Sequence, residues 1–145
     1  MSGRPFVIFA EDDHEDWGLI QDALEECRLE DSPIWERCLD GRALLDRLRD
    51  SARPTPDLIM LDLRMPRMDG AEALDALKAD PALKHIPVVV LTTSKSEADV
   101  FMAYHKGASS YVVKPVSYDA IKESLRALKH YWTTVARVPK NGAPR

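Results

Sequence analysis

Runs of apolar residues separated by polar stretches mark five segments of the chain as buried strands. Four of the runs are largely apolar throughout, which is typical of strands covered on both faces: Phe6–Ala10, Leu58–Leu61, Pro87–Leu91 and Ser110–Val113. The remaining segment, Ile34–Leu39, contains the polar residues Glu36 and Arg37, so we expect it at an edge of the sheet.

The stretches between these segments have the period of helices. The first carries its apolar residues at steps of three and four: Trp17, Ile20, Leu24 and Cys27. Four more helices are expected to begin at or near residues that can cap a helix: Asp40, Asp69, Ser96 and Ser117. Gly107 should end the fourth helix. Five strands alternating with five helices predict an α/β fold with a mostly parallel five-stranded sheet, covered on both faces.

The last helix is predicted to be long, because no Pro or Gly occurs from Ser117 to about Arg137. Its apolar stripe consists of Ile121, Leu125, Leu128, Trp132 and Val135. At 1.5 Å per residue such a helix spans about 30 Å, whereas the strands reach only about 17–20 Å. Residues 1–138 are therefore expected to form one domain with an extended C-terminal helix, followed by a loose C-terminal tail at residues 139–145.

The overhanging end of this helix exposes apolar residues, Tyr131 among them, and such surface usually marks an interface. We therefore expect a homodimer through the last helix and its extension, since most soluble oligomers have twofold symmetry. An alternative stays open, in which the overhang folds back over its own domain.

Composition and charge exclude several classes of protein. The 145 residues carry a net charge of −4, so we expect no general nucleic-acid partner. The longest apolar run, Phe6–Ala10, is too short to span a membrane, and we expect no membrane partner. Cys27 and Cys38 are too few for a disulfide framework, and we interpret them as reduced thiols in a cytoplasmic protein.

The residues just past the predicted strands offer acids, hydroxyls and a base. In sheets of this kind ligands bind beyond the carboxyl ends of the strands. Three acids begin at Glu11, Asp62 follows the third strand, and Thr92 and Lys114 follow the last two. Carboxylates on neighbouring strands repel one another unless a cation such as Mg²⁺ joins them. With the cation bound, Asp62 can act as a nucleophile and form an aspartyl phosphate.

Four motifs occur in order along the chain: Phe9-Ala10-Glu11-Asp12-Asp13, Asp62-Leu63-Arg64-Met65-Pro66-Arg67-Met68-Asp69-Gly70, Leu91-Thr92-Thr93-Ser94 and Tyr111-Val112-Val113-Lys114-Pro115. Together they resemble the receiver domain of two-component response regulators over about residues 5 to 130. This resemblance implies a flavodoxin-like (βα)₅ fold with strand order 2-1-3-4-5. It also implies a phosphoacceptor rather than an enzyme, although receivers assist their own phosphoryl transfer and dephosphorylation.

The resemblance implies a role for each matching acidic residue. Asp62 corresponds to the phosphoacceptor. Glu11 and Asp12 correspond to the acidic pair, with Asp12 as the direct metal ligand. The backbone carbonyl of Arg64 corresponds to the third protein ligand of Mg²⁺.

The other matching residues correspond to groups that respond to the phosphoryl group. Thr92 corresponds to the switch hydroxyl, Lys114 to the lysine that pairs with phosphate, and Tyr111 to an aromatic switch. An alternative stays open for Tyr111, in which it is a half-buried packing residue that never switches. The Lys114–Pro115 peptide is usually cis in this family, and we expect it to be cis here.

The expected partner is a histidine kinase. Residues 97–107 and 110–116, with the Tyr131-Trp132 ending, resemble single-domain regulators that accompany phytochrome-type histidine kinases. The expected function is thus a single-domain response regulator that signals through its fourth helix, fifth strand and fifth helix. The serious rival is a receiver-fold interaction module that acts without phosphorylation. The output of a phosphorylated form is also open: a diffusible effector, a relay intermediate or a phosphate sink.

Overall fold

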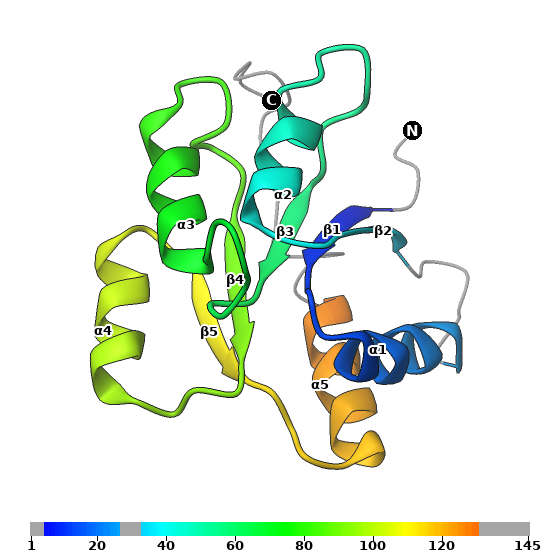
Figure 1. The fold of residues 1–145 in the computed structure, drawn as a ribbon. Helices are drawn as coiled ribbons and strands as arrows, with labels where there is room; N and C mark the ends of the chain where they lie inside the picture. The colour runs from blue at the N-terminus through cyan, green and yellow to red at the C-terminus, as the bar shows by residue number, and fades with distance from the viewer. Residues whose placement is uncertain (1–4, 27–32, 131–145) are drawn as a thin grey trace.

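Five parallel strands form a single sheet in the computed structural model, which describes residues 5–26 and 33–130. The strands are β1 (Phe6–Ala10), β2 (Ile34–Cys38), β3 (Leu58–Leu61), β4 (Val88–Thr92) and β5 (Ser110–Val113). Their order is β2-β1-β3-β4-β5 (Figure 1). The predicted sheet, its strand order and the edge position of β2 are confirmed. The predicted bounds were wrong by one residue in β2 and β4.

Five helices alternate with the strands as predicted: α1 (His14–Glu26), α2 (Gly41–Leu48), α3 (Gly70–Ala79), α4 (Glu97–His105) and α5 (Tyr118–His130). Asp40, Asp69 and Ser96 are the N-caps of α2, α3 and α4, and each side chain accepts a hydrogen bond from the backbone N–H three residues later. Gly107 follows α4 with a φ of +105°, a conformation that a residue with a Cβ rarely adopts.

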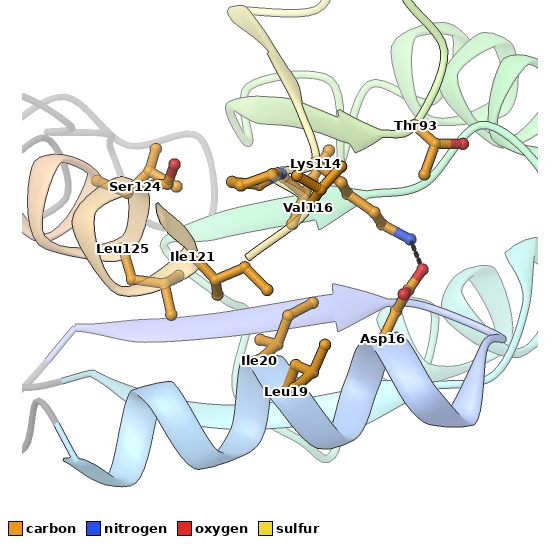
Figure 2. A pocket seen from close by; sticks show the side chains of 12 residues that line it. Asp16, Leu19, Ile20, Thr93, Lys114, Val116, Ile121, Ser124 and Leu125 are labelled. Carbon is orange, nitrogen blue, oxygen red and sulfur yellow. Dashed lines mark hydrogen bonds and ion pairs between the residues drawn. The ribbon is translucent and has the colours of Figure 1, made fainter. Parts of the chain in front are cut away.

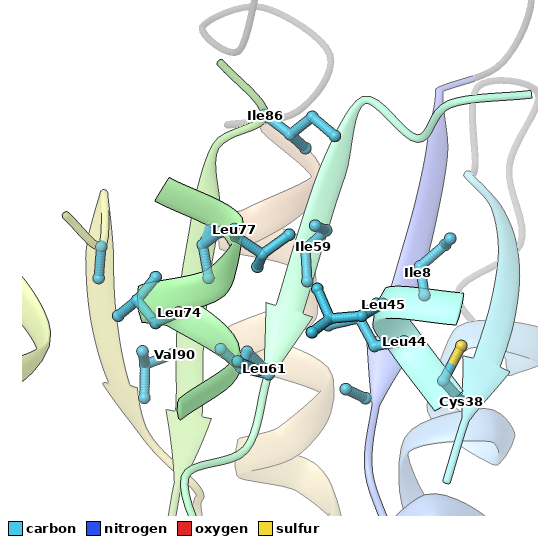
Figure 3. Close-up of a cluster of buried hydrophobic side chains, with 14 of the residues drawn as sticks. Ile8, Cys38, Leu44, Leu45, Ile59, Leu61, Leu74, Leu77, Ile86 and Val90 are labelled. Carbon is cyan, nitrogen blue, oxygen red and sulfur yellow. The ribbon is translucent and has the colours of Figure 1, made fainter. Parts of the chain in front are cut away.

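The sheet buries alternate residues on its two faces, as a strand must. Val7, Phe9 and Met60 pack against α1 and α5, which lie side by side on one face (Figure 1). The opposite face packs against α2, α3 and α4, and Figure 3 shows Leu44 of α2 and Leu74 of α3 over it. Each such leucine contributes about 1.5–3 kcal/mol relative to an exposed one.

Two predictions fall on parts of the chain outside the described residues. One is the place of Cys27 on the apolar face of the first helix. The other is the helical extension and the C-terminal tail, which were expected within residues 131–145. Cys38 is a buried free thiol whose pKa is raised to about 11, first by burial, which makes its reactive thiolate form rare. Within the described ranges, no helix is both long and apolar enough to cross a membrane.

Candidate functional site

The acidic residues predicted to meet do so because β1 and β3 are neighbours in register. Ala10 pairs with Leu61, so Glu11 and Asp62 follow adjacent strand ends. The Asp62 N–H also donates to the Ala10 carbonyl at 3.1 Å, which continues the pairing beyond the strands. Both acidic residues are buried, with only 2% of Glu11 and 6% of Asp62 exposed.

Three carboxylates form a cluster that fits a divalent cation. One oxygen each from Glu11, Asp12 and Asp62 lies within 4.8 Å of the other two. Such hard oxygen ligands in small number suit Mg²⁺, which keeps water or phosphate oxygens in its remaining positions. The Arg64 N–H donates to Asp62 Oδ1 at 3.3 Å, which brings residue 64 back beside the cluster. That its carbonyl binds the metal stays a prediction.

Lys114 occupies the centre of the site from the end of β5. Its Nζ lies 2.6 Å from Glu11 Oε1, 2.8 Å from Asp16 Oδ2 and 3.0 Å from Asp62 Oδ2. The peptide bond between Lys114 and Pro115 is trans, so the expectation of a cis bond was wrong. The chain leaving β5 brings the ammonium to Asp62 with a trans bond, because β5 pairs with β4 and Lys114 N–H donates to the Thr92 carbonyl at 2.7 Å.

The charged groups of this site shift one another's pKa values. Burial, with the nearby charge of Asp62, raises the pKa of Glu11 to about 7, although Lys114 acts in the opposite direction. For Lys114, burial lowers the pKa, but hydrogen bonds to Asp16 and Glu11 and the negative charges around it outweigh burial and raise it. The Lys114 side chain therefore stays protonated and positively charged. Its single positive charge faces three carboxylates, which leaves the site receptive to a cation.

Thr92 carries a buried hydroxyl at the end of β4. The residue is 0% exposed, and its Oγ1 has no hydrogen-bond partner within the part of the chain that the structure describes. Buried polar atoms are nearly always paired, so this hydroxyl is available to a group bound at the strand ends. A phosphoryl oxygen on Asp62 is a group that can satisfy it.

Tyr111 ties β5 to the loop after β4. The residue is half-buried, and its hydroxyl donates to the Ser94 carbonyl at 2.9 Å. Its ring also packs against the core cluster that covers the α3 and α4 face of the sheet. Tyr111 is thus placed to respond to movement of residues 92–94, while its role as a switch stays a prediction.

A polar network joins the loop after Asp62 to α4. Arg64 Nη2 donates to Asp99 Oδ2 at 2.8 Å, and Ser94 Oγ donates to the same oxygen at 2.6 Å. Asp99 lies in the first turn of α4. The side chains two residues after Asp62 and after Thr92 are therefore held together by one carboxylate.

The same loop is anchored on its other side by α2. Arg67 has a φ of +63°, in the left-handed region, and its guanidinium pairs with the buried Asp40 carboxylate that also caps α2. The Gly41 N–H donates to the Met68 carbonyl at 3.0 Å. The backbone around Asp62 is thus fixed from both sides, which is what a site needs to hold ligands in place.

Sequence reasoning missed Asp16 and Asp99 as members of the site. Asp16 lies in the first turn of α1, whereas Asp12 precedes that helix. Helical periodicity therefore did not indicate that Asp16 would join the site. Asp99 follows the cap of α4 by three residues, and nothing in its spacing indicated Arg64 as a partner.

The strand order and the grouping of Asp62 with Lys114, Thr92 and two further acids define a receiver domain. Comparison with known families agrees. Residues 7–126 match the response regulator receiver domain, and the chain belongs to that family.

Related proteins cover most of the chain. It is 40% identical to the probable methanogenesis regulatory protein FilR2 of Methanothrix harundinacea, over 93% of this chain and 88% of that protein. It is 33% identical to the response regulator Rcp1 of Synechocystis sp., over 92% of each chain. The phosphorylated cyanobacterial phytochrome response regulator RcpA superposes with a TM-score of 0.87 at 32% identity, over 95% of this chain and 100% of that one.

Proposed function

We propose that this chain is a phosphorylation switch in which Asp62 accepts a phosphoryl group from a histidine kinase while Mg²⁺ is bound. The observation that carries the proposal is the contact between Lys114 Nζ and Asp62 Oδ2, at 3.0 Å, beside the cluster of three carboxylates. The protein acts as a phosphoacceptor rather than as an enzyme with a separate substrate. We also propose that it acts in the cytoplasm, where ATP is available to phosphorylate the kinase.

The transfer follows from the groups in the site. An Asp62 carboxylate oxygen attacks the phosphorus of a phosphohistidine, and the O–P bond forms as the N–P bond breaks. The electron pair of the broken bond stays on the imidazole nitrogen. Lys114 and the Thr92 hydroxyl then donate to the transferred oxygens. Bound Mg²⁺ supplies positive charge that offsets the carboxylates and the phosphoryl oxygens.

The metal assignment rests on Glu11, Asp12 and Asp62, with the Arg64 carbonyl as a further ligand. Support comes from the distances within the acidic cluster. It also comes from the Mn²⁺-bound form of the response regulator Rcp1, which superposes on this chain with a TM-score of 0.82 at 31% identity, over 93% of this chain and 99% of that one. Mn²⁺ and Mg²⁺ both take hard oxygen ligands.

The rival function, an interaction module that is never phosphorylated, is separated by one experiment. The protein is incubated with acetyl phosphate in the presence of Mg²⁺ or of a chelator, and its intact mass is measured. We expect an added mass of one phosphoryl group with Mg²⁺ and none with the chelator. An unchanged mass in both samples would favour the interaction module.

The proposed kinase is of the phytochrome type. Support comes from RcpA, a cyanobacterial phytochrome response regulator that is similar to 95% of this chain at 32% identity. A kinase of this type should phosphorylate the protein faster than an unrelated histidine kinase at equal concentration. Equal rates from the two kinases would remove the support for this pairing.

The proposed output face consists of α4, β5 and α5. Phosphorylation draws the Thr92 hydroxyl toward Asp62, and the Ser94 carbonyl held by Tyr111 moves with the same loop. We expect beryllofluoride with Mg²⁺, a stand-in for the phosphoryl group, to shift amide NMR signals across residues 96–121. Shifts confined to the loop after Asp62 would contradict a switch that reaches α4 and β5.

The proposed assembly is a homodimer through α5 and its extension, together with the α4 face. On α4, Phe101 is 70% exposed and Tyr104 is 48% exposed, which is much apolar surface for one helix. We expect the full-length protein to be a dimer by light scattering at micromolar concentration, and removal of residues 131–145 to give a monomer. A monomeric full-length protein, with or without beryllofluoride, would contradict this assembly.

A further inference from the structure

Lys114 is shared among three carboxylates, and one of them lies outside the acidic cluster. Its Nζ contacts Asp16 Oδ2 at 2.8 Å, a shorter distance than the 3.0 Å to Asp62 Oδ2. Asp16 projects from the first turn of α1 toward the lysine, as Figure 2 shows. An ammonium has three N–H donors. With Glu11 as the third partner, the donors of Lys114 are fully used.

A cation bound in the acidic cluster would affect the three carboxylates that contact Lys114 differently. Glu11 and Asp62 belong to the cluster whose oxygens fit a divalent cation, so their oxygens can turn from the lysine to the metal. Asp16 is not a member of that cluster. Its side chain is 34% exposed and pairs with Lys114 from outside the cluster, so a cation held by the cluster does not require its oxygens. Asp16 is thus the partner that still binds Lys114 when a phosphoryl group arrives.

We propose that Asp16 is a positioning residue that competes with the phosphoryl group for Lys114 and so weakens the hold of the site on that group. This inference rests on the proposed function. A phosphoryl oxygen on Asp62 needs the positive charge of Lys114, and Asp16 shares that charge through its ion pair at 2.8 Å. The Asp16 carboxylate also repels the negative phosphoryl oxygens, because it lies close to the same nitrogen. Asp16 therefore favours the unphosphorylated state.

The test is the affinity for beryllofluoride at saturating Mg²⁺, measured from the ¹⁹F NMR signals of the bound fluoride. Asp16→Asn keeps the shape and removes the charge, and we expect it to bind about three- to tenfold more tightly than the wild-type protein, as for loss of one nearby charge in a partly exposed site. Asp16→Ala, which also removes the hydrogen bond, should bind more tightly as well.

Two further variants separate this role from a structural one. Glu15→Gln removes the same charge from the same turn of α1, at an exposed residue, and should change the affinity by less than about twofold. Asp16→Glu restores a carboxylate that can reach Lys114, and should return the affinity toward the wild-type value. If Asp16 served only the folding of the protein, Asp16→Glu would not return the beryllofluoride affinity to the wild-type value.

The outcomes distinguish the two proposals. If the wild-type protein binds beryllofluoride and Asp16→Asn binds it equally or more weakly, the role of Asp16 is overturned. The proposed function would then still stand. An equal gain in Asp16→Asn and Glu15→Gln would also overturn it, because the effect would then be general charge. Failure of the wild-type protein to bind beryllofluoride with Mg²⁺ would overturn the proposed function and this inference with it.

Discussion

An Asp62→Asn protein should accept no phosphoryl group from a histidine kinase or from acetyl phosphate. The amide has nearly the same shape as the carboxylate but is not a competent nucleophile. Lys114 keeps Glu11 and Asp16 as partners, so loss of one ion pair should not unfold the domain. We expect labelling below detection by intact mass or autoradiography, and a melting temperature within a few degrees of the wild type.

The matched control is Asp75→Asn. Asp75 lies in α3, its side chain is 58% exposed, and it forms an ion pair with Lys106, which lies outside the site. This variant loses the same charge and should be phosphorylated at the wild-type rate. Full labelling of Asp62→Asn would place the phosphoacceptor elsewhere. Loss of labelling in both variants would mean that net charge, and not residue 62, decides the result.

Gly70→Ala should be strongly destabilising. Gly70 is the first residue of α3, and a Cβ there would lie 2.3 Å from the Asp62 carbonyl oxygen and 2.7 Å from the Leu63 Cα. Both are backbone atoms and cannot move aside as a flexible side chain can. We expect a loss of about 2–3 kcal/mol in the free energy of unfolding, measured by denaturant titration. The strain falls on the loop after Asp62, so the proposed phosphorylation should slow as well.

Gly18→Ala should change the free energy of unfolding in the opposite direction and stabilise the protein. Gly18 lies inside α1, and a Cβ there would have no atom within 4 Å. Alanine is the better helix former, so we expect a gain of about 0.5–1 kcal/mol. Equal effects of the two substitutions would contradict the close approach of α3 to the loop after Asp62.

Much of the fold was predictable because local patterns and global topology agree. Apolar runs identified the strands, and the caps Asp40, Asp69 and Ser96 identified three helix starts. The gathering of Glu11 and Asp62 followed from parallel strands that end at one edge of the sheet. The order of the strands came from the family resemblance, since periodicity does not say which strands are neighbours.

The remaining features depend on contacts between distant side chains. Asp16 and Lys114 are 98 residues apart, and Arg64 and Asp99 are 35 apart, so only the packed fold brings them together. Arg67 was part of a recognised motif, but its ion pair with Asp40 was not predicted. The pair depends on a positive φ at Arg67, and an arginine in the sequence gives no sign of that conformation. The bond before Pro115 was predicted to be cis but is trans, because the prediction came from the family and not from this chain.

The most direct test of the central claim is to find the residue that carries the phosphoryl group. The protein is treated with acetyl phosphate and Mg²⁺ and then with borohydride, which reduces an aspartyl phosphate to homoserine, and its peptides are sequenced by mass spectrometry. We predict homoserine at position 62 in the sample with Mg²⁺ and unchanged Asp62 in the sample with chelator. Homoserine at another position, or none in either sample, would contradict a phosphorylation switch at Asp62.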